Sequence, residues 1–356
     1  MSTAPNVFDI AREAGVSKST AARALSGTGA VSATARARVL AAAESLKYRV
    51  SSVARSLRSG ENRLLGVVLP MSGSAGFLSH TISAQKLEGI ASAARRLRYD
   101  LQIFIENLDD PEALRALSTD RSVRGLFFFG RVARGVLEHL NAYQVPWIGL
   151  NWRHVDWEAG ACVWTDFQQA GATLAGHLFD QGCRRVLAFD WLSAEYGPYD
   201  EGFTQAVFDR NLPYAALEVR TGRRYYDGAP VAAELARAFA PGRAAPDGLV
   251  LGSSSGAIAA YRFLARERPE LRIGVDVRMA TFDDLDKTAA LEPGLTAYAQ
   301  DMAGIGARAL ETMDGWLAGQ TPPVEQRVAG ELRVRGSSDA AAAMAGAAGR
   351  GEEGPL

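Results

Sequence analysis

The stretch FDIAREAGVSKST, residues 8–20, decides how the N-terminal part of this chain folds. It joins two amphipathic helical segments through Gly15, a residue that tolerates the left-handed backbone at a helix end. Asn6 can cap the first helix, and Ser17 can cap the second, which we expect over residues 18–25. Two short helices around a glycine turn form the helix-turn-helix plan.

The second helix of this pair has one basic face without carboxylates. At about 100° per residue, Lys18, Ser19 and Arg23 lie on one side, whereas Ala21 and Ala24 lie on the other. The major groove of DNA favours such a face, because a carboxylate there would meet phosphates and Arg23 can donate two hydrogen bonds to guanine. A solvated face of an ordinary helix would have the same composition.

The charge is unevenly distributed along the 356 residues. Residues 1–63 hold ten Lys/Arg and four Asp/Glu, whereas the rest holds 29 Lys/Arg and 36 Asp/Glu. A basic head on an acidic body suggests a polyanionic partner for the head, although chance variation of the surface would also produce it.

Residues 51–59 follow a third predicted helix over residues 32–46 and form a Ser-capped helical segment that Gly60 ends. A helix of this length is unstable alone. The segment is therefore either a simple linker or a helix that folds only on its target.

Residues 8–58 resemble the LacI/GalR family of bacterial transcriptional regulators. The resemblance rests on residues 8–20 and on the string VARSLR at 53–58. It implies that the short linker is a hinge helix, which pairs with that of a second subunit and wedges a leucine into the minor groove of a near-palindromic operator. The chain departs from the family at Ala21-Ala22, where Val-Ser is common. The DNA-binding residues implied are Ser17, Lys18, Ser19, Thr20, Arg23, Ala54, Arg55 and Leu57.

The body, residues 61–336, alternates short apolar runs with amphipathic helical runs. This alternation predicts an α/β fold with parallel sheets covered on both faces. About 275 residues exceed one comfortable core, so we expect two lobes with a ligand between them, at the carboxyl ends of the strands.

The resemblance extends to the body, which looks like a periplasmic-binding-protein-like effector domain. It implies that the chain crosses between lobes near 181–182, 298–300 and 319–322. The predicted domains are a head over 1–60 with its hinge at 51–59, a first lobe over 61–180 and 300–320, a second lobe over 181–299 and 321–336, and a disordered tail over 337–356.

The resemblance also implies candidate effector-binding residues. Asp166 and Asp283 match acidic positions that accept hydrogen bonds from sugar hydroxyls, although a helix cap and a turn are the alternatives. Tyr199 and Ser253 stand where many relatives carry Arg and Asn-Asp, which argues for a neutral sugar or polyol over an anion. Aromatic rings could stack on such a ligand or pack in the core; those considered are Phe77, Trp152, Trp164, Trp191 and Tyr225, of which Phe77, Trp191 and Tyr225 join the predicted site.

No catalytic constellation, cofactor motif or metal-ligand spacing emerges. Two cysteines, Cys162 and Cys183, make no disulfide framework, and the four histidines are scattered. No apolar run reaches the length of a membrane helix, and the N-terminus lacks a signal-peptide pattern, so we expect a cytoplasmic protein.

The sequence thus predicts a homodimeric, DNA-binding transcriptional repressor that is not an enzyme and that a small-molecule effector controls. A solute-binding protein of the same fold and a regulator whose effector is not a sugar are the alternatives. The tail lacks leucine repeats, so the expected assembly is a dimer.

Overall fold

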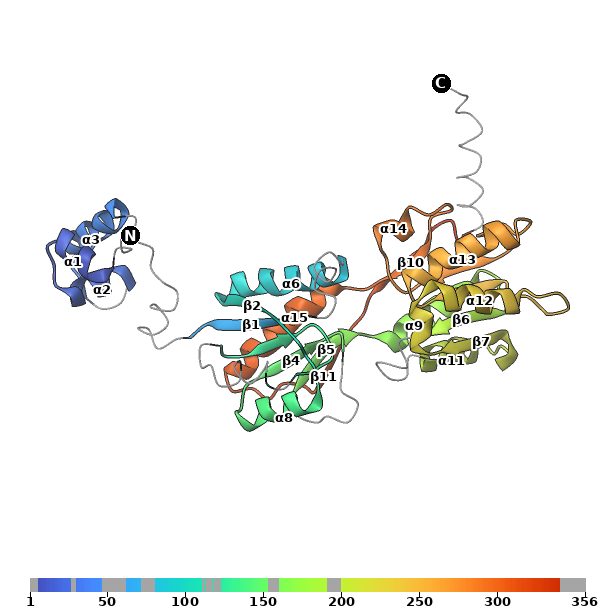
Figure 1. Ribbon diagram of the computed structural model, residues 1–356, viewed down its shortest axis with the longest axis horizontal. Coiled ribbons are helices and arrows are strands. Elements are labelled where there is room, and N and C mark those ends of the chain that lie inside the picture. The colour runs from blue at the N-terminus through green and yellow to red at the C-terminus, as the bar shows by residue number, and fades with distance from the viewer. Residues whose placement is uncertain are drawn as a thin grey trace, which may run out of the picture.

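The structure is a computed structural model that describes residues 6–26, 30–46, 62–71, 81–110, 123–152, 160–190 and 200–339, together with Glu112 and Leu117. Its described elements form a small helical head and two α/β lobes (Figure 1). The predicted hinge helix at 51–59 lies outside the described residues.

The head consists of three helices: α1 (Val7–Glu13), α2 (Lys18–Ser26) and α3 (Ala33–Ser45). The predicted caps are present: Asn6 Oδ1 accepts from the Phe8 amide at 2.8 Å, and Ser17 Oγ accepts from the Thr20 amide at 3.1 Å. Gly15 has a φ of 59°, as a glycine turn requires. The buried core of the head contains Ile10, Ala11, Ala14, Ala21, Ala24, Val39 and Ala42.

The first lobe is a six-stranded parallel sheet in the order β11-β5-β4-β3-β1-β2. One face packs against α6 (Thr81–Leu97) and α15 (Met302–Leu317), and the other against α8 (Arg134–Ala142). Its strands are β1 (Leu64–Pro70), β2 (Asp100–Glu106), β3 (Leu126–Phe128), β4 (Trp147–Leu150), β5 (Ala161–Thr165) and β11 (Glu325–Val328).

The second lobe repeats this plan with the order β12-β10-β9-β8-β6-β7, in which only the β10–β12 pair is antiparallel. Its strands are β6 (Val186–Asp190), β7 (Leu217–Thr221), β8 (Gly248–Leu251), β9 (Arg278–Thr281), β10 (Thr296–Ala299) and β12 (Glu331–Arg333). Its helices are α9 (Phe167–Asp180) and α11 (Asp200–Asp209) on one face, α12 (Gly228–Ala238) and α13 (Ser254–Glu267) on the other, and the short α14 (Asp286–Ala289), η1 (Tyr214–Ala216) and η2 (Arg223–Tyr226).

Within the described residues the chain passes between the lobes after β5, after β10 and after β11 (Figure 1). The first and third passages differ from the predicted 181–182 and 319–322. Helix α9 packs on the second sheet, so the first passage comes before it, at Asp166. Strand β11 belongs to the first sheet, so the third passage falls at residues 329–330.

The second lobe continues into the region predicted as tail. Ser337 and Ser338 are fully buried. Ser337 Oγ donates to the Met279 carbonyl at 2.6 Å, and Ser338 Oγ lies 2.6 Å from Thr296 Oγ1 and 2.7 Å from His177 Nε2. The predicted start of the disordered tail at 337 is therefore wrong, because these hydroxyls are part of the core; residues 340–356 lie outside the described part of the chain.

Cys162 and Cys183 are buried free thiols. In the described ranges, no helix is long and apolar enough to cross a membrane, and no cluster of three His, Cys, Asp or Glu residues could hold a metal ion.

Candidate functional site

Helix α2 presents its basic side chains to solvent. Lys18, Ser19 and Arg23 are exposed, whereas Ala21 and Ala24 face the core of the head. The helix contains no acidic residue, so its N-terminal dipole and its side chains share one sign. The structure therefore brings the predicted major-groove residues onto one exposed face.

Contacts within the head hold this face in place. Lys18 Nζ lies 4.0 Å from the centroid of the exposed Phe8 ring of α1. The Ser17 hydroxyl lies 2.9 Å from that of Ser19 and 2.8 Å from that of Thr20. Such contacts lower the entropy that these side chains lose on meeting DNA. The other predicted DNA-binding residues, Ala54, Arg55 and Leu57, lie outside the described residues.

A chain of hydrogen bonds links the carboxyl ends of the two sheets. Asn151, after β4, accepts from the Thr165 amide through Oδ1 at 2.9 Å. The Thr165 hydroxyl donates to Gln300 Oε1 at 2.6 Å, and Gln300 Nε2 donates to Asp283 Oδ1 at 2.8 Å. Asp283 follows β9 and Gln300 follows β10. Polar groups of both lobes thus meet where ligands bind in folds of this kind.

The two adjacent aspartates, Asp283 and Asp284, differ in their surroundings. Asp284 forms ion pairs with Arg333 and Arg335, each at 2.8 Å, and these fasten the segment of β12. Asp283 has no ion pair within the described part of the chain. Burial raises the pKa of Asp283 from 3.8 to about 6, although the Gln300 hydrogen bond and Lys287 act the other way. Asp283 is thus the aspartate that can accept a ligand's hydrogen bonds.

The predicted aromatic residue Tyr225 packs in the core. It is 1% exposed, and its ring centroid lies 5.5 Å from that of Phe189. Its neighbour Tyr226 is 43% exposed; partial burial raises the pKa of the Tyr226 phenol, and the charges of Asp283 and Asp227 add to this. Tyr225 thus follows the core-packing alternative that the sequence left open, and among the described residues Tyr226 is an exposed aromatic residue close enough to Asp283 to sense its charge.

Two other predicted residues serve as helix caps. Asp166 Oδ1 accepts from the Gln169 amide at 3.0 Å and begins α9. Ser253 Oγ accepts from the Gly256 amide at 3.0 Å and donates to the Tyr226 carbonyl at 2.8 Å, so it holds Tyr226 beside α13. Phe77, Trp191 and Tyr199 lie outside the described residues, and the rings of Trp152 and Trp164 are buried.

Sequence reasoning missed a buried amine in the first lobe. Lys86 lies on α6 and is 5% exposed. Its Nζ lies 5.1 Å from the centroid of the Phe129 ring, which follows β3. The signal in the sequence is a lysine at the core spacing of an amphipathic helix, between Ser83 and Ile90.

Comparisons with known proteins agree with this architecture. The model of bacterial regulatory proteins of the lacI family matches residues 6–51, and that of the periplasmic binding protein-like domain matches residues 175–338. This chain belongs to the lacI family of bacterial regulatory proteins. It is a DNA-binding transcriptional regulator in which a helix-turn-helix head precedes an effector-binding type of domain.

Relatives of this lacI-family chain are regulators over their full lengths. Catabolite control protein A of Priestia megaterium is 25% identical over 321 residues, which cover 88% of this chain and 93% of that protein. The HTH-type transcriptional regulator PtxS of Pseudomonas putida is 28% identical over 341 residues, which cover 93% and 95%. A lac repressor dimer bound to operator and the anti-inducer ONPF has the same fold, with a TM-score of 0.77 and 19% identity over 95% of this chain and 100% of that one.

Proposed function

We propose that this regulator is a homodimeric repressor of transcription, whose affinity for a near-palindromic operator is set by a polyhydroxylated effector held between the lobes. The observation that carries the proposal is the hydrogen-bond chain from Asn151 to Asp283. It joins polar side chains from the carboxyl ends of both sheets into one connected set.

The head supplies the DNA contacts in this proposal. Arg23 reads a base through its guanidinium, whereas Lys18 and the hydroxyls of Ser17, Ser19 and Thr20 meet base edges or phosphates near the start of α2. Leu57, with Ala54 and Arg55 beside it, enters the minor groove at the operator centre.

The second lobe supplies the polar anchor and the ring for the effector. The ionised Asp283 carboxylate accepts hydrogen bonds from hydroxyl groups, and the exposed face of Tyr226 packs against the C–H face of a sugar or polyol. Phe77, Trp191 and Tyr199 remain predicted contacts of the same ligand. Asp166 and Ser253 act through the helices that they cap.

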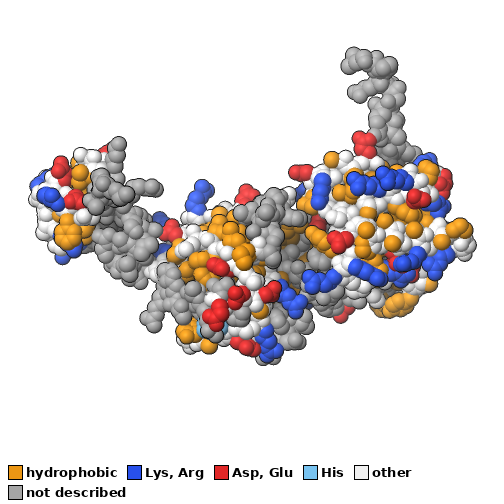
Figure 2. All heavy atoms as spheres, viewed as in Figure 1, with side chains coloured by type: hydrophobic (Ala, Val, Ile, Leu, Met, Phe, Trp, Pro, Cys, Tyr) orange, Lys and Arg blue, Asp and Glu red, His pale blue; other side chains and the backbone are white. Residues whose placement is uncertain are grey.

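The first lobe offers a surface for the second subunit. Ile103 and Ile105 of the edge strand β2 are 48% and 49% exposed. Hydrophobic side chains are visible on this lobe over α6 and β2 (Figure 2). An edge strand with exposed isoleucines is an aggregation hazard unless a partner covers it, which a dimer would do.

Coupling between effector and operator follows from the passages between the lobes. A ligand that binds Asp283 changes the groups competing for Gln300, which holds Thr165 of the first lobe. It therefore favours one arrangement of the lobes over another, and operator affinity shifts by the difference in its affinity for the two.

The test is selection of a DNA site from a random pool with the full chain, followed by titration of the selected site. We expect a two-fold symmetric site and a loss of about 1–3 kcal/mol for Arg23→Ala, confined to sites with the selected base. Arg266→Ala, which removes an exposed arginine of α13 in the second lobe, is the matched control and leaves binding unchanged. Failure to select any sequence would contradict the proposal. If Arg23→Ala weakened binding equally on all DNA sequences, Arg23 would contact only phosphates.

A further inference from the structure

We propose that the effector carries a carboxylate and that Lys86 of the first lobe binds it, so that the ligand is a sugar acid or a similar hydroxylated acid. This inference rests on the proposed function and narrows its polyol effector to one with a single negative charge.

The first observation is the burial of a charged group in an otherwise small and apolar helix face. The buried positions of α6 are Ser83, Lys86, Gly89, Ile90, Ala93 and Ala94. Gly89 and Gly306 let α6 and α15 approach so closely that a Cβ at either position would lie about 2 Å from the other helix's backbone, 2.0 and 2.1 Å respectively. The Lys86 side chain is thus enclosed by a tightly packed helix pair and cannot extend along a solvent-facing surface.

The second observation is that this amine has no counterion among the described residues. No acidic side chain in the described ranges forms an ion pair with Lys86, and its Nζ lies 5.1 Å from the centroid of the Phe129 ring. Burial lowers the pKa of Lys86 to about 8, so the amine is still protonated in most molecules at pH 7. A buried cation without an anion is unfavourable, and such groups concentrate at functional sites.

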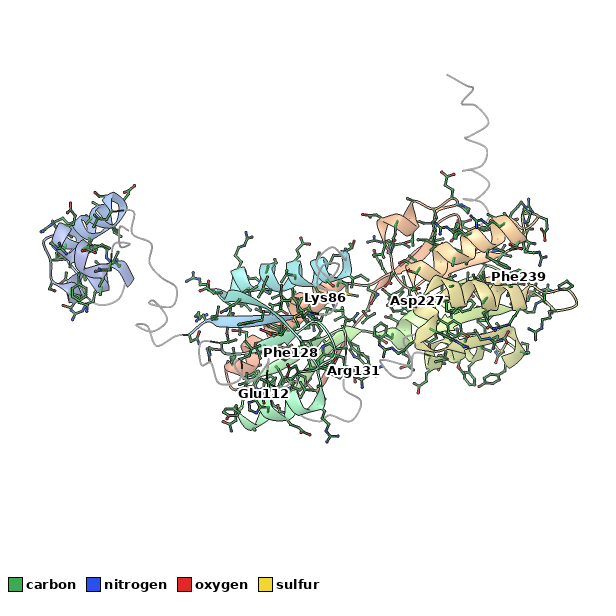
Figure 3. All side chains as sticks on the ribbon, in the orientation of Figure 1. Lys86, Glu112, Phe128, Arg131, Asp227 and Phe239 are labelled. Atoms are coloured by element: carbon green, nitrogen blue, oxygen red, sulfur yellow. The ribbon has the colours of Figure 1, made fainter. Side chains whose placement is uncertain are left out.

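The third observation is position. Phe129 directly follows β3, so the Lys86 amine lies at the carboxyl edge of the first sheet. Asn151, directly after β4, and Thr165, the last residue of β5, lie at the same edge, because the strands are parallel. In Figure 3, Lys86 lies at the end of the first lobe that faces the passages to the second lobe, where Asp227 is labelled.

The chemistry of the two lobes then defines the ligand. Lys86 offers up to three N–H donors and one positive charge, which match one carboxylate. Asp283 offers an acceptor for hydroxyl groups and repels a second negative charge. A phosphate, with nearly two negative charges at neutral pH, would need further cations. One acidic group with neighbouring hydroxyls satisfies both lobes.

The test uses the full chain and matched probes at constant ionic strength. Gluconate, glucuronate and galacturonate are compared with glucitol, glucose and galactose, and with glucose 6-phosphate, by thermal shift and calorimetric titration. We expect at least one sugar acid to bind at least tenfold more tightly than its neutral counterpart and the phosphate. Lys86→Met should weaken that acid at least tenfold, whereas Arg95→Met, on the exposed face of the same helix, should not.

Three results would overturn the inference. The first is that no sugar acid raises the melting temperature of the wild type more than that of the Lys86→Met variant. The others are tighter binding of a neutral sugar or of the phosphate than of any acid, and an acid affinity that is unchanged in Lys86→Met. Circular dichroism verifies folding of the variant, and Lys86→Gln replaces it if Lys86→Met does not fold. Operator affinity measured without any sugar tests the proposed DNA-binding function on its own. A negative result for the carboxylate site would therefore leave the evidence for DNA binding unchanged.

Discussion

The two lobes share one sheet plan but place opposite charges at their carboxyl ends. In the first lobe, Lys86 is a buried cation whose pKa is lowered, and in the second, Asp283 is a carboxylate whose pKa is raised. Neither group forms an ion pair with a described residue, whereas Asp284, next to Asp283, has two arginine partners. Asp284 thus stabilises its own lobe through ion pairs, whereas Lys86 and Asp283 are the charged groups that we propose for the ligand.

The largest expected effect is a loss of stability in the second lobe. Asp284→Asn removes the shared partner of Arg333 and Arg335, so we expect the free energy of unfolding to fall by about 2–4 kcal/mol, discounted for the exposure of Arg333. Urea unfolding of the variant beside the wild type measures this. An unchanged midpoint would show that the two ion pairs contribute nothing to stability.

The adjacent substitution, Asp283→Asn, should act in the opposite direction. The pKa of Asp283 is raised on folding, so its ionisation disfavours the folded state as the pH rises from about 4 to 6. The variant should therefore be more stable than the wild type at pH 8 and equally stable near pH 3. Unfolding curves at both pH values measure the difference, and a variant less stable at pH 8 would refute the desolvation of Asp283.

Titration of the two charges should confine acid binding to a window of pH. Affinity for a sugar acid should be greatest between about 6, where Asp283 ionises, and about 8, where Lys86 loses its proton. Outside the window it should fall by up to about tenfold per pH unit, or about 1.4 kcal/mol. Calorimetry from pH 5 to 9.5 should show that Lys86→Met removes the alkaline limb and that Asp283→Asn removes the acidic limb. If both decreases in affinity persisted in the two variants, other titrating groups would cause them.

The smallest expected effect concerns the ring. Tyr226→Leu should weaken ligand binding by about 0.5–1.5 kcal/mol because an aromatic face is lost, whereas Tyr226→Phe keeps the ring and should change affinity less. The same calorimetric titration compares them. A greater loss for Tyr226→Phe would mean that the phenol hydroxyl, not the ring, meets the ligand.

Sequence reasoning succeeded where the signals are local. In the head, Asn6, Gly15 and Ser17 each act through neighbours within a few residues, so capping rules sufficed. The parallel α/β lobes followed from the alternation of apolar strands and amphipathic helices. Asp283 was proposed from the family resemblance; it lies after β9, as a strand-end position requires, and its contact with a ligand stays a prediction.

Other features depend on contacts far apart in sequence. Strands β11 and β12 are short and polar, and only pairing with β5 and β10 makes them strands. Tyr225 and Tyr226 share a 3-10 turn, which gives no periodicity to decide which ring is buried. Lys86 was visible as a lysine at a core position of α6, but the lack of an acidic partner among the residues that the structure describes is a property of the fold.

The most direct test of the account is the affinity of the full chain for its selected operator, measured with and without the sugar acid that stabilises it. The account predicts that the acid changes the operator dissociation constant by at least about fivefold in the wild type, the lower end of ordinary allosteric coupling. Lys86→Met should bind the operator as the wild type does without acid and show no change when the same acid concentration is added. An equal response in both proteins, or none in the wild type, would contradict the claim that opposite charges on the two lobes hold the effector that controls DNA binding.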